Sequence, residues 1–245
     1  PATLISNLNN AQNNGVHFVS HDNQRLLLLS KYLKDGSSVT GASNTERLKD
    51  GTWSKPKKLK IKNYHNKDLC SFYMNDKEDR LLLAINHKDS HGEQDIYVSF
   101  KEGNKWSKPI NLGPQINTLK SEGAMTLAPD NKTLYFSSNG DFSGSQGGYD
   151  IYKTERLDDS WTNWSTPENI GFPYNTPYDE LYYTFSPNDE YTYLSRHFVD
   201  EDAVDHSDII AIKEKNVEVN STVMVNVFDS ETNERIVANV TLTDL

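Results

Sequence analysis

The chain has 245 residues, of which 35 are acidic and 25 basic, for a formal net charge of −10. Hydrophobic residues make up 35% of it and aromatic residues 11%, values that suit a soluble β-rich protein. We expect no nucleic-acid partner, because the charge balance offers little to neutralise phosphates. No apolar stretch approaches the ~20 residues of a membrane helix, so we expect no transmembrane segment. Cys70 is the single cysteine and excludes an internal disulfide.

Four similar units follow one another along the chain. Each has an extended stretch, a polar turn, a short apolar run, and then a loop rich in Gly, Asp and Ser. The loop leads into Asp95-Ile96-Tyr97 in the second unit and Asp150-Ile151-Tyr152 in the third, and Asp208 opens a related run in the fourth. The units cover about 15–65, 66–117, 118–175 and 176–215, with apolar runs at 26–29, 81–85, 134–136 and 191–194.

The tetrad Trp-Ser-x-Pro occurs three times, beginning at Trp53, Trp106 and Trp164, and the fourth unit has no copy. Recurrence at such an interval is typical of solenoids and propellers. Each apolar run is short, rich in aromatic residues and bounded by Gly, Pro, Asn or Asp, which indicates strands and not helices. The sequence therefore predicts an all-β fold, a β-propeller of four-stranded blades, with four repeats visible and room for five or more in a full protein.

The repeated residues have structural explanations. We expect the Trp and Asp-Ile-Tyr aromatics to pack between blades and the tetrad Pro to lie in an outer strand, where no ladder partner needs its N–H. The Asp before Ile-Tyr is interpreted as a turn residue whose carboxylate accepts hydrogen bonds from backbone N–H groups.

The two ends of the chain differ from the repeats. Residues 5–10 resemble the segment that follows Pro109, so they either close the ring by pairing with the last unit or belong to a blade cut away upstream. We favour the second alternative. Past Lys215, alternating valines and a polar turn predict a hairpin of another kind. We therefore divide the chain into a propeller, 1–215, and the beginning of a second β-domain, 216–245.

The third unit carries a family resemblance. Its run Asn117-Thr118, Glu122, 128–130, 134–139 and Gly147 to Tyr152 resembles the WD40-like (PD40, TolB-type) propeller repeat of OmpA-family, PorE-like envelope proteins of Bacteroidota. Residues 225–242 are similar to the start of a carboxypeptidase-regulatory-like β-sandwich. The resemblance implies a non-enzymatic scaffold at the periplasmic face of the outer membrane, linked to type IX secretion. It implies protein partners in the cell envelope, and peptidoglycan contact only through a domain that this sequence lacks.

Candidate sites are less specific. For the interaction module we expect the long inserts 34–41, 87–94, 140–148 and 197–207 to form the binding surface. The alternative, a propeller that hydrolyses or binds glycans, predicts three carboxylates from different blades around the channel mouth. Neither reading assigns a catalytic residue or a cofactor.

Clusters of charged residues allow both a structural and a functional interpretation. The lysines between 55 and 62 are interpreted as one solvated strand face, with phosphate or glycan binding as the alternative. Metal readings exist for 87–95 (His87, His91, Glu93 and Asp95) and for 200–208 (Asp200, Glu201, Asp202, Asp205, His206 and Asp208). Neither has zinc-ligand spacing or a complete calcium loop, so we assign no metal, although calcium in the second remains an alternative.

Overall fold

The computed structural model describes residues 5, 7–9, 14–67, 70–186, 190–200, 204–213 and 232. The chain divides into two units, Pro1–Glu214 and Lys215–Leu245. The second β-domain expected over 216–245 lies, apart from Thr232, outside the described residues and stays a prediction. No helix in the described part of the chain is long and apolar enough to cross a membrane.

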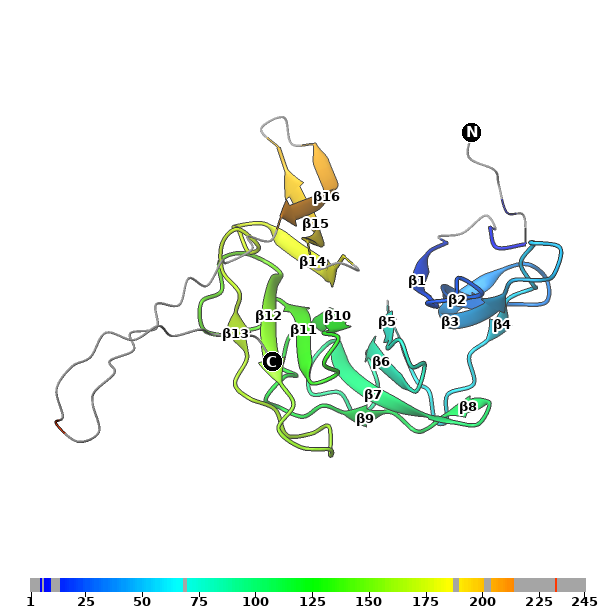
Figure 1. The fold of residues 1–245 in the computed structure, drawn as a ribbon, viewed down its shortest axis with the longest axis horizontal. Helices are drawn as coiled ribbons and strands as arrows, with labels where there is room; N and C mark the ends of the chain where they lie inside the picture. The colour runs from blue at the N-terminus through cyan, green and yellow to red at the C-terminus, as the bar shows by residue number, and fades with distance from the viewer. Residues whose placement is uncertain are drawn as a thin grey trace. The chain divides into compact units, whose positions relative to one another are not determined.

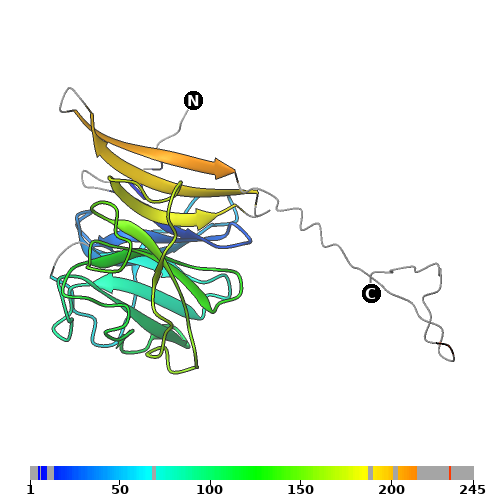
Figure 2. The same ribbon diagram turned by 90° about the vertical axis from the view of Figure 1, so that its left-hand side faces the viewer.

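Sixteen strands in the described ranges form four antiparallel sheets (Figures 1 and 2). Each sheet corresponds to one sequence unit, and its strands pair in chain order, except that β9 pairs with β7. The strands are β1 (Val16–Val19), β2 (Arg25–Tyr32), β3 (Ser38–Glu46) and β4 (Lys57–Lys58); β5 (Ser71–Met74), β6 (Arg80–Ile85), β7 (Asp95–Glu102), β8 (Lys105–Trp106) and β9 (Ile110–Asn111); β10 (Glu122–Leu127), β11 (Thr133–Ser138), β12 (Asp150–Glu155) and β13 (Glu168–Asn169); β14 (Asp179–Phe185), β15 (Tyr191–Val199) and β16 (Asp205–Lys213).

The four sheets are the blades of a β-propeller, which confirms the predicted fold class. The first strands of the blades, β1, β5, β10 and β14, face the middle of the unit in Figure 1. Each contacts the next one along the chain: β1 meets β5, β5 meets β10, and β10 meets β14. The described part of the fourth blade has three strands, which lie side by side in Figure 2.

Apolar packing lies within and between successive blades, as the aromatic repeats predict. One buried cluster joins Leu82 and Val98 of the second blade to Phe136 and Tyr152 of the third, with Trp161 and Trp164. A second joins the first and second blades around Tyr97 and Trp106, and a third joins the third and fourth around Ile151 and Tyr183. A single blade would expose both of its apolar faces, so this packing is the main source of stability.

The tetrad serine makes the same hydrogen bonds in every copy. Ser107 Oγ accepts the backbone N–H of Phe100 at 2.9 Å, and the Ser107 carbonyl accepts the hydroxyl of Ser99 at 2.8 Å. Ser54 and Ser165 do the same in the first and third blades. The tetrads therefore fasten the chain beside the third strand of each blade.

The Asp that opens the Asp-Ile-Tyr run, or the related Asp-Ile-Ile run of the fourth unit, is a turn residue in two of these three units. The Asp95 carboxylate accepts N–H groups of His91 and Gly92, and Asp150 accepts that of Gln146. Asp208, by contrast, is exposed on β16. That turn prediction holds for the second and third blades only.

Residues near the N-terminus contact the first blade. The Asn7 side chain donates to the Trp53 carbonyl, and the Tyr32 hydroxyl donates to the Leu8 carbonyl at 2.5 Å. In the described residues 5 and 7–9 we find no pairing with β16. The described part of the fold thus gives no support to ring closure by this segment.

Candidate functional site

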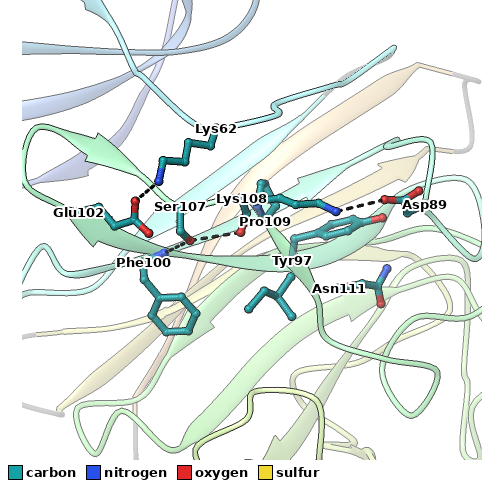
Figure 3. Close-up of a pocket in the computed structure, with 10 residues that line it drawn as sticks. Lys62, Asp89, Tyr97, Phe100, Glu102, Ser107, Lys108, Pro109 and Asn111 are labelled. Carbon is teal, nitrogen blue, oxygen red and sulfur yellow. Dashed lines mark hydrogen bonds and ion pairs between the residues drawn. The ribbon is translucent and has the colours of Figure 1, made fainter.

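A cavity of about 600 Å³ lies beside the second blade (Figure 3). Its walls come from β7, from the second tetrad, from the loop after β6 and from the linker between β4 and β5. We call it the blade 2 cavity and define it by Lys62, Asp89, Tyr97, Phe100, Glu102, Ser107, Lys108, Pro109, Ile110 and Asn111.

The tetrad and the linker hold the cavity in shape. Ser107 is bonded to β7 as described above, so the segment from Ser107 to Pro109 follows the strand closely. Trp106 N–H donates to the Lys60 carbonyl at 2.8 Å, and Lys62 N–H donates to the Trp106 carbonyl at 3.0 Å. These bonds bring the linker from the first blade alongside the second, and they place Lys62 at the cavity.

Two ion pairs lie at opposite ends of the cavity (Figure 3). Lys62 Nζ is 2.5 Å from Glu102 Oε2, and Lys108 Nζ is 3.9 Å from Asp89 Oδ2. All four side chains are more than 40% exposed. Exposed pairs of this kind contribute little to stability and are screened by salt, so the four groups remain available to a polar ligand.

The floor between the ion pairs is less polar. Tyr97 is buried, and its hydroxyl lies 3.0 Å from Ser90 Oγ. Burial raises the pKa of Tyr97, so its hydroxyl stays protonated at neutral pH. Phe100, Pro109 and Ile110 add apolar surface. An apolar wall with a few convergent polar groups is typical of small-molecule sites.

The described first strands of the blades carry two buried glutamates at matching positions. Glu122 and Glu180 hold corresponding positions at the starts of β10 and β14, but neither is exposed at all. Glu122 accepts Thr118 N–H at 2.9 Å and the hydroxyls of Thr118 and Ser138 at 2.6 and 2.7 Å. Burial raises the pKa of Glu122, as in a general acid, yet every bond it makes is structural.

Glu180 is held in the same way. It accepts the Thr176 N–H at 3.1 Å and the Arg196 Nε–H at 2.8 Å. Glu122 and Glu180 therefore occupy matching positions because each hydrogen-bonds the linker that leads into its blade. The expected ring of three exposed carboxylates is not found among the described residues of β1, β5, β10 and β14.

The inserts expected to form a binding surface all join the second and third strands of their blades. Two of them are bound to the next linker along the chain. A Cβ on Gly92 would lie 2.4 Å from the Thr118 carbonyl oxygen, and one on Gly147 would lie 2.6 Å from Pro177. The close approach needs glycine at both positions, so these two inserts pack against the linker to the next blade. Only Asp89, from the insert 87–94, reaches the blade 2 cavity.

The structure places the lysine cluster on an exposed face and gives no metal-binding group in the described residues. All five lysines between 55 and 62 are exposed, as expected for a solvated face, and Lys62 alone of them lines the blade 2 cavity. Among the described residues, no group of three or more His, Cys, Asp or Glu side chains could hold a metal ion. In the second metal reading, Asp200 instead pairs with His206 at 2.7 Å, and Glu201 and Asp202 lie outside the described residues.

Sequence reasoning did not find the blade 2 cavity. Its residues are spread over some fifty positions and meet because the linker runs beside β8, where Ile61 pairs with Trp106. One signal was present: the tetrads have Lys at their third position in two copies and Thr in the third.

Comparison with known proteins gives structural likeness alone. No family model matches the chain, and no curated protein matches it. A thermostable family-43 glycoside hydrolase aligns at a TM-score of 0.50 and 12% identity, over 83% of this chain and 73% of that one. An α-L-arabinofuranosidase from Lactobacillus brevis aligns at a TM-score of 0.48 and 13% identity, over 82% of this chain and 72% of that one. The periplasmic gluconolactonase of Pseudomonas aeruginosa aligns at a TM-score of 0.45 and 9% identity, over 86% of this chain and 61% of that one.

These likenesses correct the expected function. The family-43 glycoside hydrolase, the neighbour with a TM-score of 0.50, is an enzyme by its name. The expectations of a non-enzymatic scaffold and of a chain without activity are therefore wrong by this comparison, because the repeat pattern that suggested them reports the fold and not the chemistry. At such low identity the likeness establishes the fold: the chain is a β-propeller.

Proposed function

We propose that the protein is a glycan-active propeller of the hydrolase type that binds a saccharide in the blade 2 cavity. The observation that carries the proposal is the pairing of an apolar wall with two exposed Lys–carboxylate pairs in one cavity of about 600 Å³. A pyranose or furanose ring has an apolar C–H face and a rim of hydroxyls that both donate and accept. Pro109 and Ile110 suit the face, and the charged groups suit the rim.

The fold supports the same choice. The family-43 glycoside hydrolase shares the propeller at a TM-score of 0.50, and its name states the class of bond it breaks. Hydrolysis of a glycoside needs one carboxylic acid and one carboxylate on either side of the bond. Asp89 and Glu102 are the carboxylates that line the cavity, so they are the candidates for these two roles.

The experiment measures binding and hydrolysis separately. The protein is titrated with neutral and acidic oligosaccharides by calorimetry, and reducing ends are counted after incubation with the matching polysaccharides. We expect Lys108→Ala and Glu102→Gln to weaken binding about tenfold, the loss of one charge-assisted hydrogen bond. Glu168→Gln on the exposed part of β13 is the matched control and should bind as the parent does.

The outcomes separate the two parts of the proposal. Hydrolysis that disappears in Asp89→Asn or Glu102→Gln, with the fold intact by circular dichroism, assigns those carboxylates to the reaction. Binding without hydrolysis keeps the cavity as a saccharide site and removes the hydrolase assignment. If no saccharide binds, or if the three cavity variants bind as Glu168→Gln does, the proposal is wrong.

We also propose a cell-envelope location with envelope protein partners, which rests only on the resemblance of the third unit. Fractionation of the native host with an antibody against this chain tests the location. Recovery in the cytosolic fraction would contradict it.

A further inference from the structure

A second cavity, of about 390 Å³, lies between the second and third blades. Its walls combine cations, amides and aromatic rings from both blades. We call it the interblade cavity and define it by Asn75, Lys77, Asp79, Arg80, Phe100, Asn131, Arg156, Asp159 and Trp161. It shares only Phe100 with the blade 2 cavity, and its argument is independent of the proposed function.

Two guanidinium groups lie over aromatic rings in this cavity. The Arg80 group lies 5.0 Å from the centre of the Phe100 ring, and the Arg156 group lies 4.8 Å from that of Trp161. The two rings meet edge to face at 6.1 Å. A cation–π contact of this kind restrains the guanidinium and does not use its N–H groups, which stay available for hydrogen bonding.

Much of that hydrogen-bonding capacity is unused by the described residues. Arg80 makes its bonds through Nη1, to the carbonyl and carboxylate of Asp79. Arg156 also uses Nη1, to the Asp158 carbonyl and to Asp159, whose side chain is fully exposed. The Nε–H of Arg156 is buried and has no hydrogen-bond partner among the described residues. The edge of Arg80 formed by Nε and Nη2 lines the cavity and can donate to a ligand with acceptor oxygens.

The neighbouring blade pair shows what occupies the equivalent place. Arg25 begins β2 as Arg80 begins β6, and both of its free edge atoms contact one carboxylate: Nε lies 2.9 Å and Nη2 2.6 Å from Glu78 Oε1. Glu78 belongs to the turn that precedes the second strand of the next blade. The corresponding residue of the third blade is Asn131, and the backbone matches, with φ of 53° at Glu78 and 54° at Asn131.

A neutral amide thus replaces the acid between the second and third blades. The hydrogen-bonding network changes with it: Asn131 Oδ1 accepts from Asn75 Nδ2 at 3.2 Å and leaves Arg80 Nε and Nη2 without a carboxylate. The space changes as well, since the hollow lined by Arg25 and Glu78 measures about 40 Å³ and the interblade cavity about 390 Å³.

We propose that the interblade cavity binds an oxyanion at Arg80 and Arg156, in the place that the Glu78 carboxylate takes between the first and second blades. The group is a sulfate, a phosphate or a carboxylate, because each presents two oxygens to the edge of a guanidinium. Lys77 adds a third cation to the same wall. The ligand is either a free inorganic anion or an acidic group on a larger molecule such as a uronic acid.

The test is a titration of the whole chain at constant ionic strength, with sodium sulfate, sodium phosphate and sodium glucuronate as probes and with calorimetry as the readout. We expect saturable binding of one equivalent. Asn131→Glu supplies the missing acid from within, so it should abolish binding. Arg80→Gln should weaken binding at least about tenfold, the loss of a charge-assisted hydrogen bond.

Controls separate this cavity from general charge effects. Lys108→Ala removes a cation from the blade 2 cavity and should leave the titration unchanged. Glu78→Gln, the change opposite to Asn131→Glu in the matched turn, should not weaken binding at the interblade cavity either. Thermal unfolding verifies that each variant is folded, and Asn131→Glu should unfold at a higher temperature than the parent without anion.

The results decide between the sources and can overturn the proposal. Tight binding of glucuronate that sulfate displaces favours an acidic saccharide, whereas binding of sulfate or phosphate alone favours a free anion. The proposal is wrong if no probe gives saturable binding at constant ionic strength. It is equally wrong if Asn131→Glu and Arg80→Gln, both folded, bind as the parent does.

Discussion

Replacing Asn117 with alanine should cost the propeller a large share of its stability. Asn117 is almost wholly buried in the linker between the second and third blades. Its Oδ1 accepts the Ile96 N–H at 2.8 Å, and its Nδ2 donates to the Ile96 carbonyl at 2.9 Å and to Asn111 Oδ1 at 2.8 Å. Asn175 makes the equivalent three bonds to Ile151 and Asn169.

The magnitude follows from these bonds. Alanine leaves the Ile96 N–H buried without its acceptor, at ~1–3 kcal/mol, and it removes two further bonds of ~1 kcal/mol, the Ile96 carbonyl keeping its bond from Leu112. We expect a loss of about 3–5 kcal/mol in the free energy of unfolding. In a domain of this size that corresponds to a fall of about 6–20 °C in Tm.

The assay is urea unfolding followed by tryptophan fluorescence, which the four tryptophans of the chain make possible. Asn175→Ala should lose a similar amount. Asn104→Ala, in the exposed turn between β7 and β8, is the matched control and should change the unfolding free energy by less than about 0.5 kcal/mol. If Asn117→Ala costs no more than Asn104→Ala, the bonds described here do not hold the linker, and the reasoning fails.

Three further predictions concern pH and the repeated bonds. Burial lowers the pKa of His17 from 6.5 to about 4, so the folded state binds fewer protons than the unfolded state between these pH values. The free energy of unfolding should therefore fall by about 3 kcal/mol as the pH drops from 6.5 to 4. Unfolding of His17→Phe, measured over the same pH range, should show a smaller fall. Burial raises the pKa of Glu122, so the contribution of this carboxyl group to stability should decline as the pH rises above the unfolded pKa of 4.5. Glu122→Gln should remove that pH dependence and lower the free energy of unfolding by ~1–3 kcal/mol, because one acceptor oxygen is lost. The same variant should leave any hydrolysis intact. Ser107→Ala removes the acceptor of the Phe100 N–H and should cost ~1–2 kcal/mol by chemical unfolding, whereas Lys105→Ala, at an exposed position of β8, should cost almost nothing.

The strands and their grouping into blades follow from local pattern. Short aromatic runs such as 134–136, bounded by turn residues, leave no helical alternative, and each tetrad marks the segment that follows the third strand of its blade. Asp95 could be predicted as a turn residue because its partners lie within four positions along the chain. Local rules are sufficient wherever the interacting groups are close in sequence.

The sites depended on contacts that no local rule reaches. Lys62 and Glu102 are forty positions apart, and Arg80 meets Arg156 only across two blades. Glu122 appeared in the repeat pattern, but a carboxylate at a blade start reads equally as a catalytic acid or as a brace. Only its complete burial, with three bonds from Thr118 and Ser138, decides for the brace.

The border between blades is a single peptide bond. Asn117 bonds back to the second blade, whereas Thr118, the next residue, bonds forward to Glu122 of the third; Asn175 and Thr176 repeat the arrangement one blade later. A segment cut from 118 to 175 therefore carries its brace, its tetrad and its closing asparagine as one set. Recombination between gene copies at the Asn-Thr junction would add or delete a whole blade with these bonds intact, whereas an exchange at a tetrad would separate the serine from its strand. This protein is built in a form that evolution, or a designer, can lengthen one blade at a time.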